Sequence, residues 1–110
     1  MERPLQPPRV PAGWTVKYNQ LHEVDPSDVN EDDRYTYLKE DLLQMTLEHF
    51  NRLLDVGWYP EGKLKEGSYR LVVYERDFRG TLLFELRTAD RSRLVAEVER
   101  LLQEVCDRRL

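Results

Sequence analysis

The stretch SYRLVVYERDFRGTLLFELR, residues 68–87, decides the fold of this chain. Apolar side chains alternate with other residues on both sides of a short segment at 76–80, and a period of two is typical of half-buried β-strands. The alternating residues are Tyr69, Leu71 and Val73 before that segment, and Leu82, Phe84 and Leu86 after it. The stretch therefore predicts two strands, over 68–75 and 81–87, which pair antiparallel through a short turn.

Two earlier segments show the same alternation and predict two more strands. The alternating residues are Trp14, Val16 and Tyr18 in the first segment, and Leu54, Val56 and Trp58 in the second. Asp25-Pro26-Ser27-Asp28 reads as a turn after the first segment, and Pro60 ends the second in a turn rich in glycine and lysine.

Two other segments carry the three- and four-residue spacing of an amphipathic helix. One opens at Thr88 or Asp90, both of which are good helix caps. Its apolar stripe comprises Leu94, Val98, Leu101, Leu102 and Val105. The other helix is predicted over 31–47, with Asn30 or Asp32 as its cap. Its apolar face comprises Tyr35, Leu38, Leu42 and Met45. The end of this second segment, 42–47, also fits a strand.

The predicted order of elements is β-α-β-β-β-α. An antiparallel sheet of about four strands, with helices packed on one face, is the simplest way to bury the apolar stripes, so the fold class is α+β. Four prolines at positions 4, 7, 8 and 11 predict an extended tail over 1–13. The remaining residues, 14–110, are expected to form a single domain.

Composition narrows the function classes. No apolar run approaches the roughly 20 residues of a transmembrane helix, so no membrane role is expected. The amino-terminal residues also lack the apolar core of a secretory signal. Because the single cysteine, Cys106, cannot form an internal disulfide, a reducing cytoplasmic setting is expected. The arginines of the last helix are interleaved with acidic residues, which argues against nucleic-acid binding.

Residues that could carry out catalysis or bind a metal are sparse. His22 lies near Glu23 and Asp25, a pattern that suits either acid–base catalysis or an ordinary surface histidine, and we favour the second. No paired cysteines or His-x-x-x-His spacing indicates a zinc site. The acidic stretch after Pro26 lacks the central glycine of an EF-hand loop. We therefore expect no metal site, no cofactor and no enzymatic activity.

The strongest functional indication is the segregation of charge. Residues 22–41 contain eight carboxylates and two cations, a net charge of −6, whereas 1–21 carries +2 and 42–110 is neutral, which together give the −4 of the whole chain. Such a segment attracts cationic partners, and tyrosines within it can serve as binding anchors. The candidate partner-binding residues are Asp25, Asp28, Glu31, Asp32, Asp33, Tyr35 and Tyr37.

Three short stretches carry a family resemblance. Residues 53–61 (LLDVGWYPE), 67–74 (GSYRLVVY) and 11–19 (PAGWTVKYN) resemble small bacterial immunity proteins of polymorphic toxin and contact-dependent growth inhibition systems. The resemblance spans roughly residues 11–105. It implies a cytoplasmic inhibitor that binds one cognate toxin domain, expected to be basic, and blocks it by occlusion without catalysis. The diversity of these families means that no binding residue is transferred from the motifs.

A second class of function remains open from the sequence. The chain also fits a non-catalytic structural or regulatory module that acts as a homo-oligomer, for example a homodimer formed through an exposed sheet edge or through the last helix. A mass that depends on concentration, without a heterologous partner, would favour this class over the toxin inhibitor.

Overall fold

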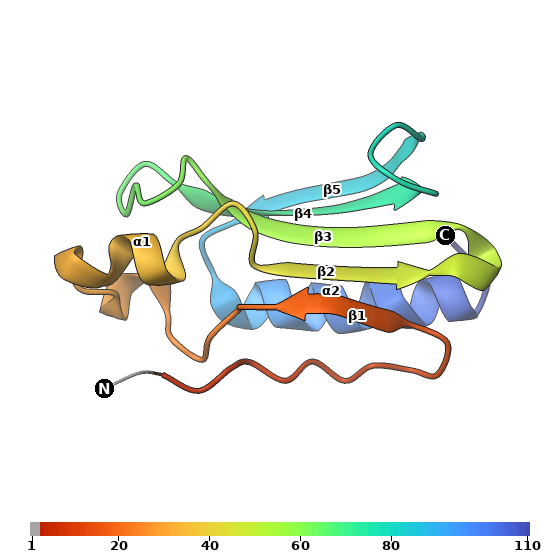
Figure 1. Ribbon diagram of the computed structural model, residues 1–110, viewed down its shortest axis with the longest axis horizontal. Helices are drawn as coiled ribbons and strands as arrows, with labels where there is room; N and C mark the ends of the chain where they lie inside the picture. The colour runs from red at the N-terminus through yellow and green to blue at the C-terminus, as the bar shows by residue number, and fades with distance from the viewer. Residues whose placement is uncertain (1–2) are drawn as a thin grey trace.

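The computed structural model describes residues 3–110 and has the predicted α+β architecture (Figure 1). One antiparallel sheet contains five strands in the sequential order β1-β2-β3-β4-β5. The strands are β1 (Thr15–Asn19), β2 (Leu43–Leu47), β3 (Arg52–Tyr59), β4 (Ser68–Glu75) and β5 (Leu82–Thr88). The helices are α1 (Arg34–Tyr37) and α2 (Arg91–Cys106), and three single 3-10 turns are η1 (Pro26–Asp28), η2 (Glu31–Asp33) and η3 (Glu48–Phe50).

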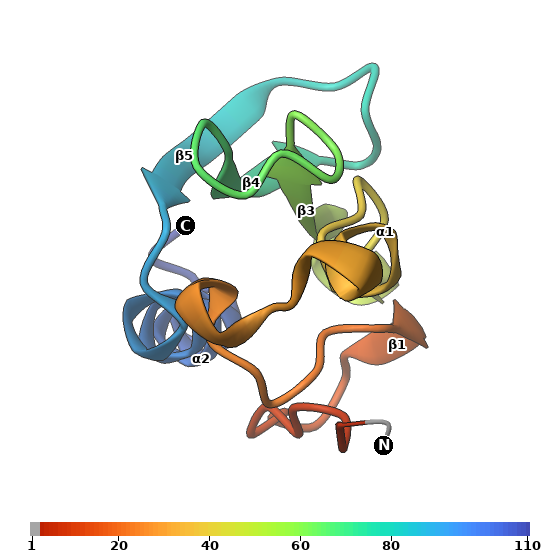
Figure 2. The same cartoon turned by 90° about the vertical axis from the view of Figure 1, so that its left-hand side faces the viewer.

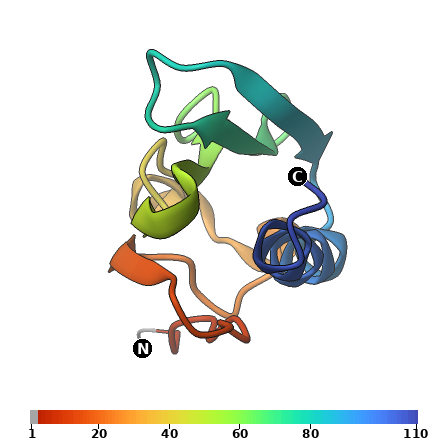
Figure 3. The same cartoon turned by 90° about the vertical axis from the view of Figure 1, so that its right-hand side faces the viewer.

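The sheet curls around α2, and the core lies between them (Figure 3). The predicted apolar stripe of α2 is confirmed, because all five of its residues are buried. The side chains that face them from the sheet are also buried, and include Met45, Leu54, Val56, Trp58, Leu71 and Val73. The face of the sheet that points toward α2 is called the inner face below, and the opposite one the outer face.

Asp90 rather than Thr88 caps α2. Its carboxylate accepts a hydrogen bond from the backbone N–H of Arg93 at 3.2 Å, which satisfies one of the free amides of the first turn. Thr88 instead ends β5, and its hydroxyl accepts from the N–H of Asp90 at 3.1 Å. Within residues 3–110, no helix has the length and apolar character needed to cross a bilayer.

The helix predicted over 31–47 is wrong beyond Tyr37. Only η2 and the four-residue α1 are helical, and Leu43–Leu47 forms strand β2, as the alternative for 42–47 allowed. β2 lies between β1 and β3 and pairs with both, so pairing along two edges outweighs the local helical spacing. The sheet consequently has five strands instead of about four, while α1 lies beyond the end of the strands (Figure 1).

Residues 3–13 are extended and run alongside α2 before the chain turns back into β1 (Figure 1). The segment and α2 run in the same direction, because residues later in one contact residues later in the other. Gln6 accepts a hydrogen bond from Arg91, and the N–H of Arg9 donates to Glu99 at 3.1 Å. Farther on, Trp14 Nε1 donates to the carbonyl of Leu102 at 3.1 Å. The segment therefore covers the gap between β1 and α2.

Candidate partner-binding site

The acidic end of the molecule, residues 25–37, consists of short turns held by a few apolar anchors. Pro26 begins η1, and α1 follows directly on η2. Val29 within the segment, and Val24 and Leu38 on either side of it, are buried in the core. Because these anchors face inward, most of the charged residues between them face solvent. Figure 2 shows this end of the molecule toward the viewer, with α1 in front.

Three of the predicted residues converge on one pocket. Asp28, Asp33 and Tyr37 line it together with Val24, Val29, Asn30, Arg3 and Pro4. Within residues 3–110, neither Asp28 nor Asp33 is in an ion pair. The hydroxyl of Tyr37 accepts a hydrogen bond from the N–H of Arg3 at 3.1 Å, and its ring meets that of His22 edge-on at 5.0 Å. Tyr37 is thus fixed in place at the wall of a pocket that is lined by two carboxylates and one arginine.

The other predicted residues lie outside this pocket. The carboxylate of Asp25 faces α2, where it pairs with Arg91 Nε at 2.9 Å. Glu31 pairs with Arg34, whose guanidinium lies over the ring of Tyr35 at 5.0 Å. Tyr35 is 58% exposed and packs against the backbone of Gly62. Asp32 is exposed and does not line the pocket.

This geometry suits a cationic side chain. Two carboxylates without ion-pair partners in the described chain, beside an aromatic ring, provide both charge and a stacking surface for an arginine or a lysine. A multidentate metal site is a poorer fit, because no group of three or more His, Cys, Asp or Glu side chains in residues 3–110 is arranged to hold a metal ion.

A second polar feature, which we call the outer-face row, crosses the outer face of the sheet. The strand registers align one residue from each strand, namely Tyr18, Gln44, Asp55, Val72 and Glu85. Asp55 lies at the centre and is only 6% exposed, which makes it the one buried charged residue of the described chain. A carboxylate in this position normally requires a cation or several hydrogen bonds.

Asp55 has hydrogen bonds but no ion pair within residues 3–110. The hydroxyl of Tyr18 and Nε2 of Gln44 both donate to its Oδ1, each at 3.4 Å. Burial raises the pKa of Asp55, and these two hydrogen bonds oppose the increase only in part. Burial, together with the nearby charges of Asp55 and Asp41, likewise raises the pKa of Tyr18.

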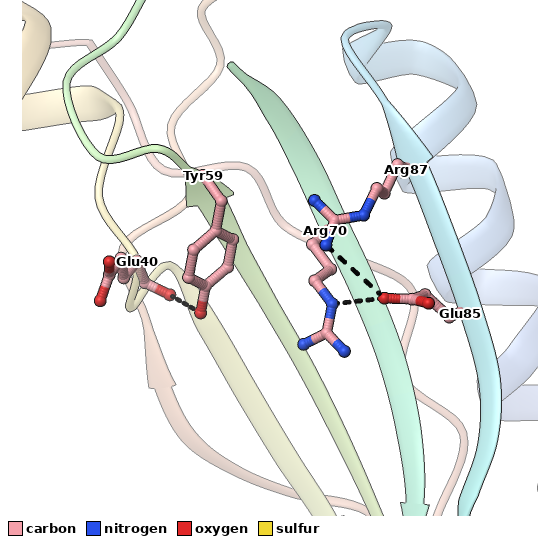
Figure 4. A network of polar contacts seen from close by, with 5 residues as sticks. All are labelled: Glu40, Tyr59, Arg70, Glu85 and Arg87. Carbon is pink, nitrogen blue, oxygen red and sulfur yellow. Dashed lines mark hydrogen bonds and ion pairs between the residues drawn. The ribbon is translucent and has the colours of Figure 1, made fainter. Parts of the chain in front are cut away.

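The positive charge of Arg70 opposes the rise in the pKa of Asp55, but Arg70 is already engaged in an ion pair. It pairs with Glu85 on β5, and Arg87 approaches the same carboxylate at 3.9 Å (Figure 4). The hydrogen bond from Arg70 lowers the pKa of Glu85. On the other side of Arg70, the hydroxyl of Tyr59 donates to the carbonyl of Glu40 at 3.5 Å (Figure 4).

Gly57 allows the chain from Lys39 to Asp41 to pass close to β3. A Cβ at position 57 would lie 2.0 Å from the carbonyl oxygen of Glu40, which no other residue could tolerate without movement of the backbone. The same segment is fastened by the N–H of Trp58, which donates to the carbonyl of Lys39 at 2.7 Å. The segment that follows the acidic end therefore lies against β3, the strand that carries Asp55.

Asp55 is not among the site residues predicted from the sequence. The available signal was a carboxylate inside the apolar run LLDVGW, residues 53–58, where an outward-facing strand position is normally expected to be solvated. Its burial depends on side chains and backbone that come from other strands, which the local pattern does not reveal.

The comparisons with known proteins add no relative. No model of a protein family matches the chain, and neither a curated protein nor a solved structure matches it.

Proposed function

We propose that this chain is an immunity-type protein that binds a basic toxin domain through its acidic end and inhibits it by occlusion. One observation carries most of the weight: Asp28, Asp33 and Tyr37 line a single pocket, and neither carboxylate has an ion-pair partner within residues 3–110. The resemblance of residues 53–61 and 67–74 to bacterial immunity proteins supports the same function.

The mechanism is the capture of a cationic side chain that the toxin needs for its own substrate. An arginine or lysine of the toxin enters the pocket between Asp28 and Asp33, and the ring of Tyr37 adds a cation–π contact. The net charge of −6 over 22–41 accelerates the encounter, whereas packing around the pocket sets the dissociation rate. Inhibition then requires no catalysis by this chain.

The first test identifies the partner. The tagged chain is used to capture proteins from a lysate of its own organism at low salt, and the bound material is eluted at high salt. We expect one stoichiometric basic protein. Its expression alone should arrest growth, and co-expression of this chain should restore growth. A captured protein that is harmless when expressed alone would contradict the immunity function, even though it would establish binding.

The second test locates the interface with matched charge reversals. The double variant Asp28→Lys, Asp33→Lys changes the pocket, whereas Glu48→Lys, Glu75→Lys makes the same change in charge at exposed sites at the opposite end of the sheet. At low salt the association rate of the first variant should fall at least about tenfold, and that of the second should change by less than about twofold. Equal association rates for the two variants would exclude the pocket as the binding site.

A further inference from the structure

Strand β5 forms an edge of the sheet. It pairs with β4 on one side, and in residues 3–110 no strand pairs with its other side. α2 packs against the inner face rather than extending the sheet (Figure 3). An unpaired edge presents free backbone N–H and C=O groups that a further strand can bind.

The phase of the backbone hydrogen bonds identifies which residues of β5 are free. The N–H of Trp58 donates toward the β2 side, to Lys39, so its neighbours in β3 point toward β4. Following the strand registers across the sheet, the backbone of Leu71 then bonds β5 at Leu86. The backbone groups of Glu85 and Arg87, which flank Leu86, consequently point away from β4 to the open edge.

These two residues are complementary to themselves. If two copies of β5 pair antiparallel about a two-fold axis at Leu86, Glu85 of each copy lies opposite Arg87 of the other, and each pair exchanges both backbone hydrogen bonds. A two-fold axis at Glu85 or at Arg87 also satisfies the backbone, but it sets like charges opposite each other. Of these three registers, only the one centred on Leu86 sets opposite charges against each other.

We propose that the free edge of β5 binds a second copy of this chain, which forms a homodimer with a continuous ten-stranded sheet. In this dimer Glu85 lies between Arg70 of its own chain, with which it already pairs, and Arg87 of the other. The side chain of Arg87 is 57% exposed and can swing to the new partner, since it lies 3.9 Å from Glu85 in the single chain. The two Leu86 side chains meet at the axis.

The dimer is independent of the proposed inhibitor function. β5 contributes no residue to the pocket of the acidic end, and antiparallel pairing about the two-fold axis places the two acidic ends on opposite sides of that axis. Loss of toxin binding in the pocket variant would leave the dimer unchanged, and loss of the dimer would leave the pocket intact. The two inferences can therefore fail separately.

The experiment is a measurement of mass against concentration by sedimentation equilibrium. The wild-type mass should rise from 13.2 kDa toward twice that value as the concentration reaches some hundreds of micromolar, as expected for a weak interface. Arg87→Glu and Glu85→Arg each set like charges opposite one another, so each should raise the dimer dissociation constant at least about tenfold. Arg109→Glu, an exposed change outside β5, is the control and should dimerise like the wild type.

Mixing the two single variants tests the register itself. One chain then carries two cations at positions 85 and 87 and the other carries two carboxylates, so the equimolar mixture should form a one-to-one heterodimer. Amide exchange in the wild type gives a readout that needs no variant, because the amides of Glu85 and Arg87 should become protected as concentration rises. A wild-type chain that stays monomeric at about 1 mM, or a dimer insensitive to both reversals, would overturn the proposal.

Discussion

The body of the molecule, formed by the sheet and α2, buries most apolar residues of β2, β3, β4 and the α2 stripe, whereas the acidic end leaves Asp28 and Asp33 without ion-pair partners in the described chain. The body is held by long paired strands and a sixteen-residue helix, and the acidic end by turns of three or four residues. Under the proposed function, stability and recognition belong to separate parts of the molecule, so we expect that each can be changed without the other.

The largest expected loss of stability comes from a cavity in the body. Leu102→Ala removes a fully buried side chain from the centre of the α2 stripe, and should lower the free energy of unfolding by about 2–5 kcal/mol. Val95→Ala, on the half-exposed side of the same helix, is the control and should lower it by less than about 1 kcal/mol. Urea unfolding measures both. A similar loss in the two variants would mean that the stripe does not hold the body together.

The stability of the body should depend on pH through one buried carboxylate, that of Asp55. Because burial raises the pKa of Asp55, the folded chain keeps its proton at pH values where the unfolded chain has released it. Unfolding then releases a proton, so the contribution of Asp55 to stability is lost as pH rises from the ordinary value near 3.8 through the raised one. Asp55→Asn removes this dependence.

The measurement for Asp55 is urea unfolding of wild type and Asp55→Asn at several pH values between 4 and 8. The stability of the variant relative to wild type should increase as pH rises. Asp41→Asn removes the exposed carboxylate that the same Tyr18 hydroxyl contacts, and it separates burial from the simple loss of charge. If the difference in unfolding free energy between Asp55→Asn and wild type stayed constant with pH, the raised pKa of Asp55 would be contradicted.

The smallest change in stability is expected for substitutions at the acidic end. Asp28→Asn and Asp33→Asn remove exposed or half-exposed carboxylates that have no ion-pair partner in residues 3–110. Each should change the free energy of unfolding by no more than about 0.5 kcal/mol, and the change should be toward greater stability at low salt because repulsion within the segment falls. A loss above about 1 kcal/mol in thermal or urea unfolding would show that these residues support the fold.

The fold could be predicted where the local pattern and the tertiary contacts agree. The strand over Ser68–Glu75 and the stripe of α2 are as expected, because the same apolar residues that set the period also face the core. The segment 42–47 shows where agreement ends. Leu42 and Met45 fit a helical face, but Met45 is paired between Val16 and Leu54, and only the neighbouring strands decide between the two structures.

The candidate site was only partly accessible from the sequence for a related reason. Segregation of charge is visible along the chain, but distant residues determine which carboxylates remain unpaired. Arg91, 66 positions later, pairs with Asp25, and Arg3 reaches the pocket from the amino-terminal segment. Asp55 is concealed in the same way, since the groups that cover it come from β1 and β2.

The course of residues 3–13 has a practical consequence for labelling the protein. This segment reaches the acidic end at Arg3, whose N–H bonds Tyr37, so an affinity tag or fluorophore joined ahead of it would be placed beside the pocket. Leu110 lies toward the opposite end of the molecule, where its carbonyl accepts from Arg52 at 3.2 Å (Figure 1). Attachment after Leu110 should therefore report binding at the acidic end without obstructing it.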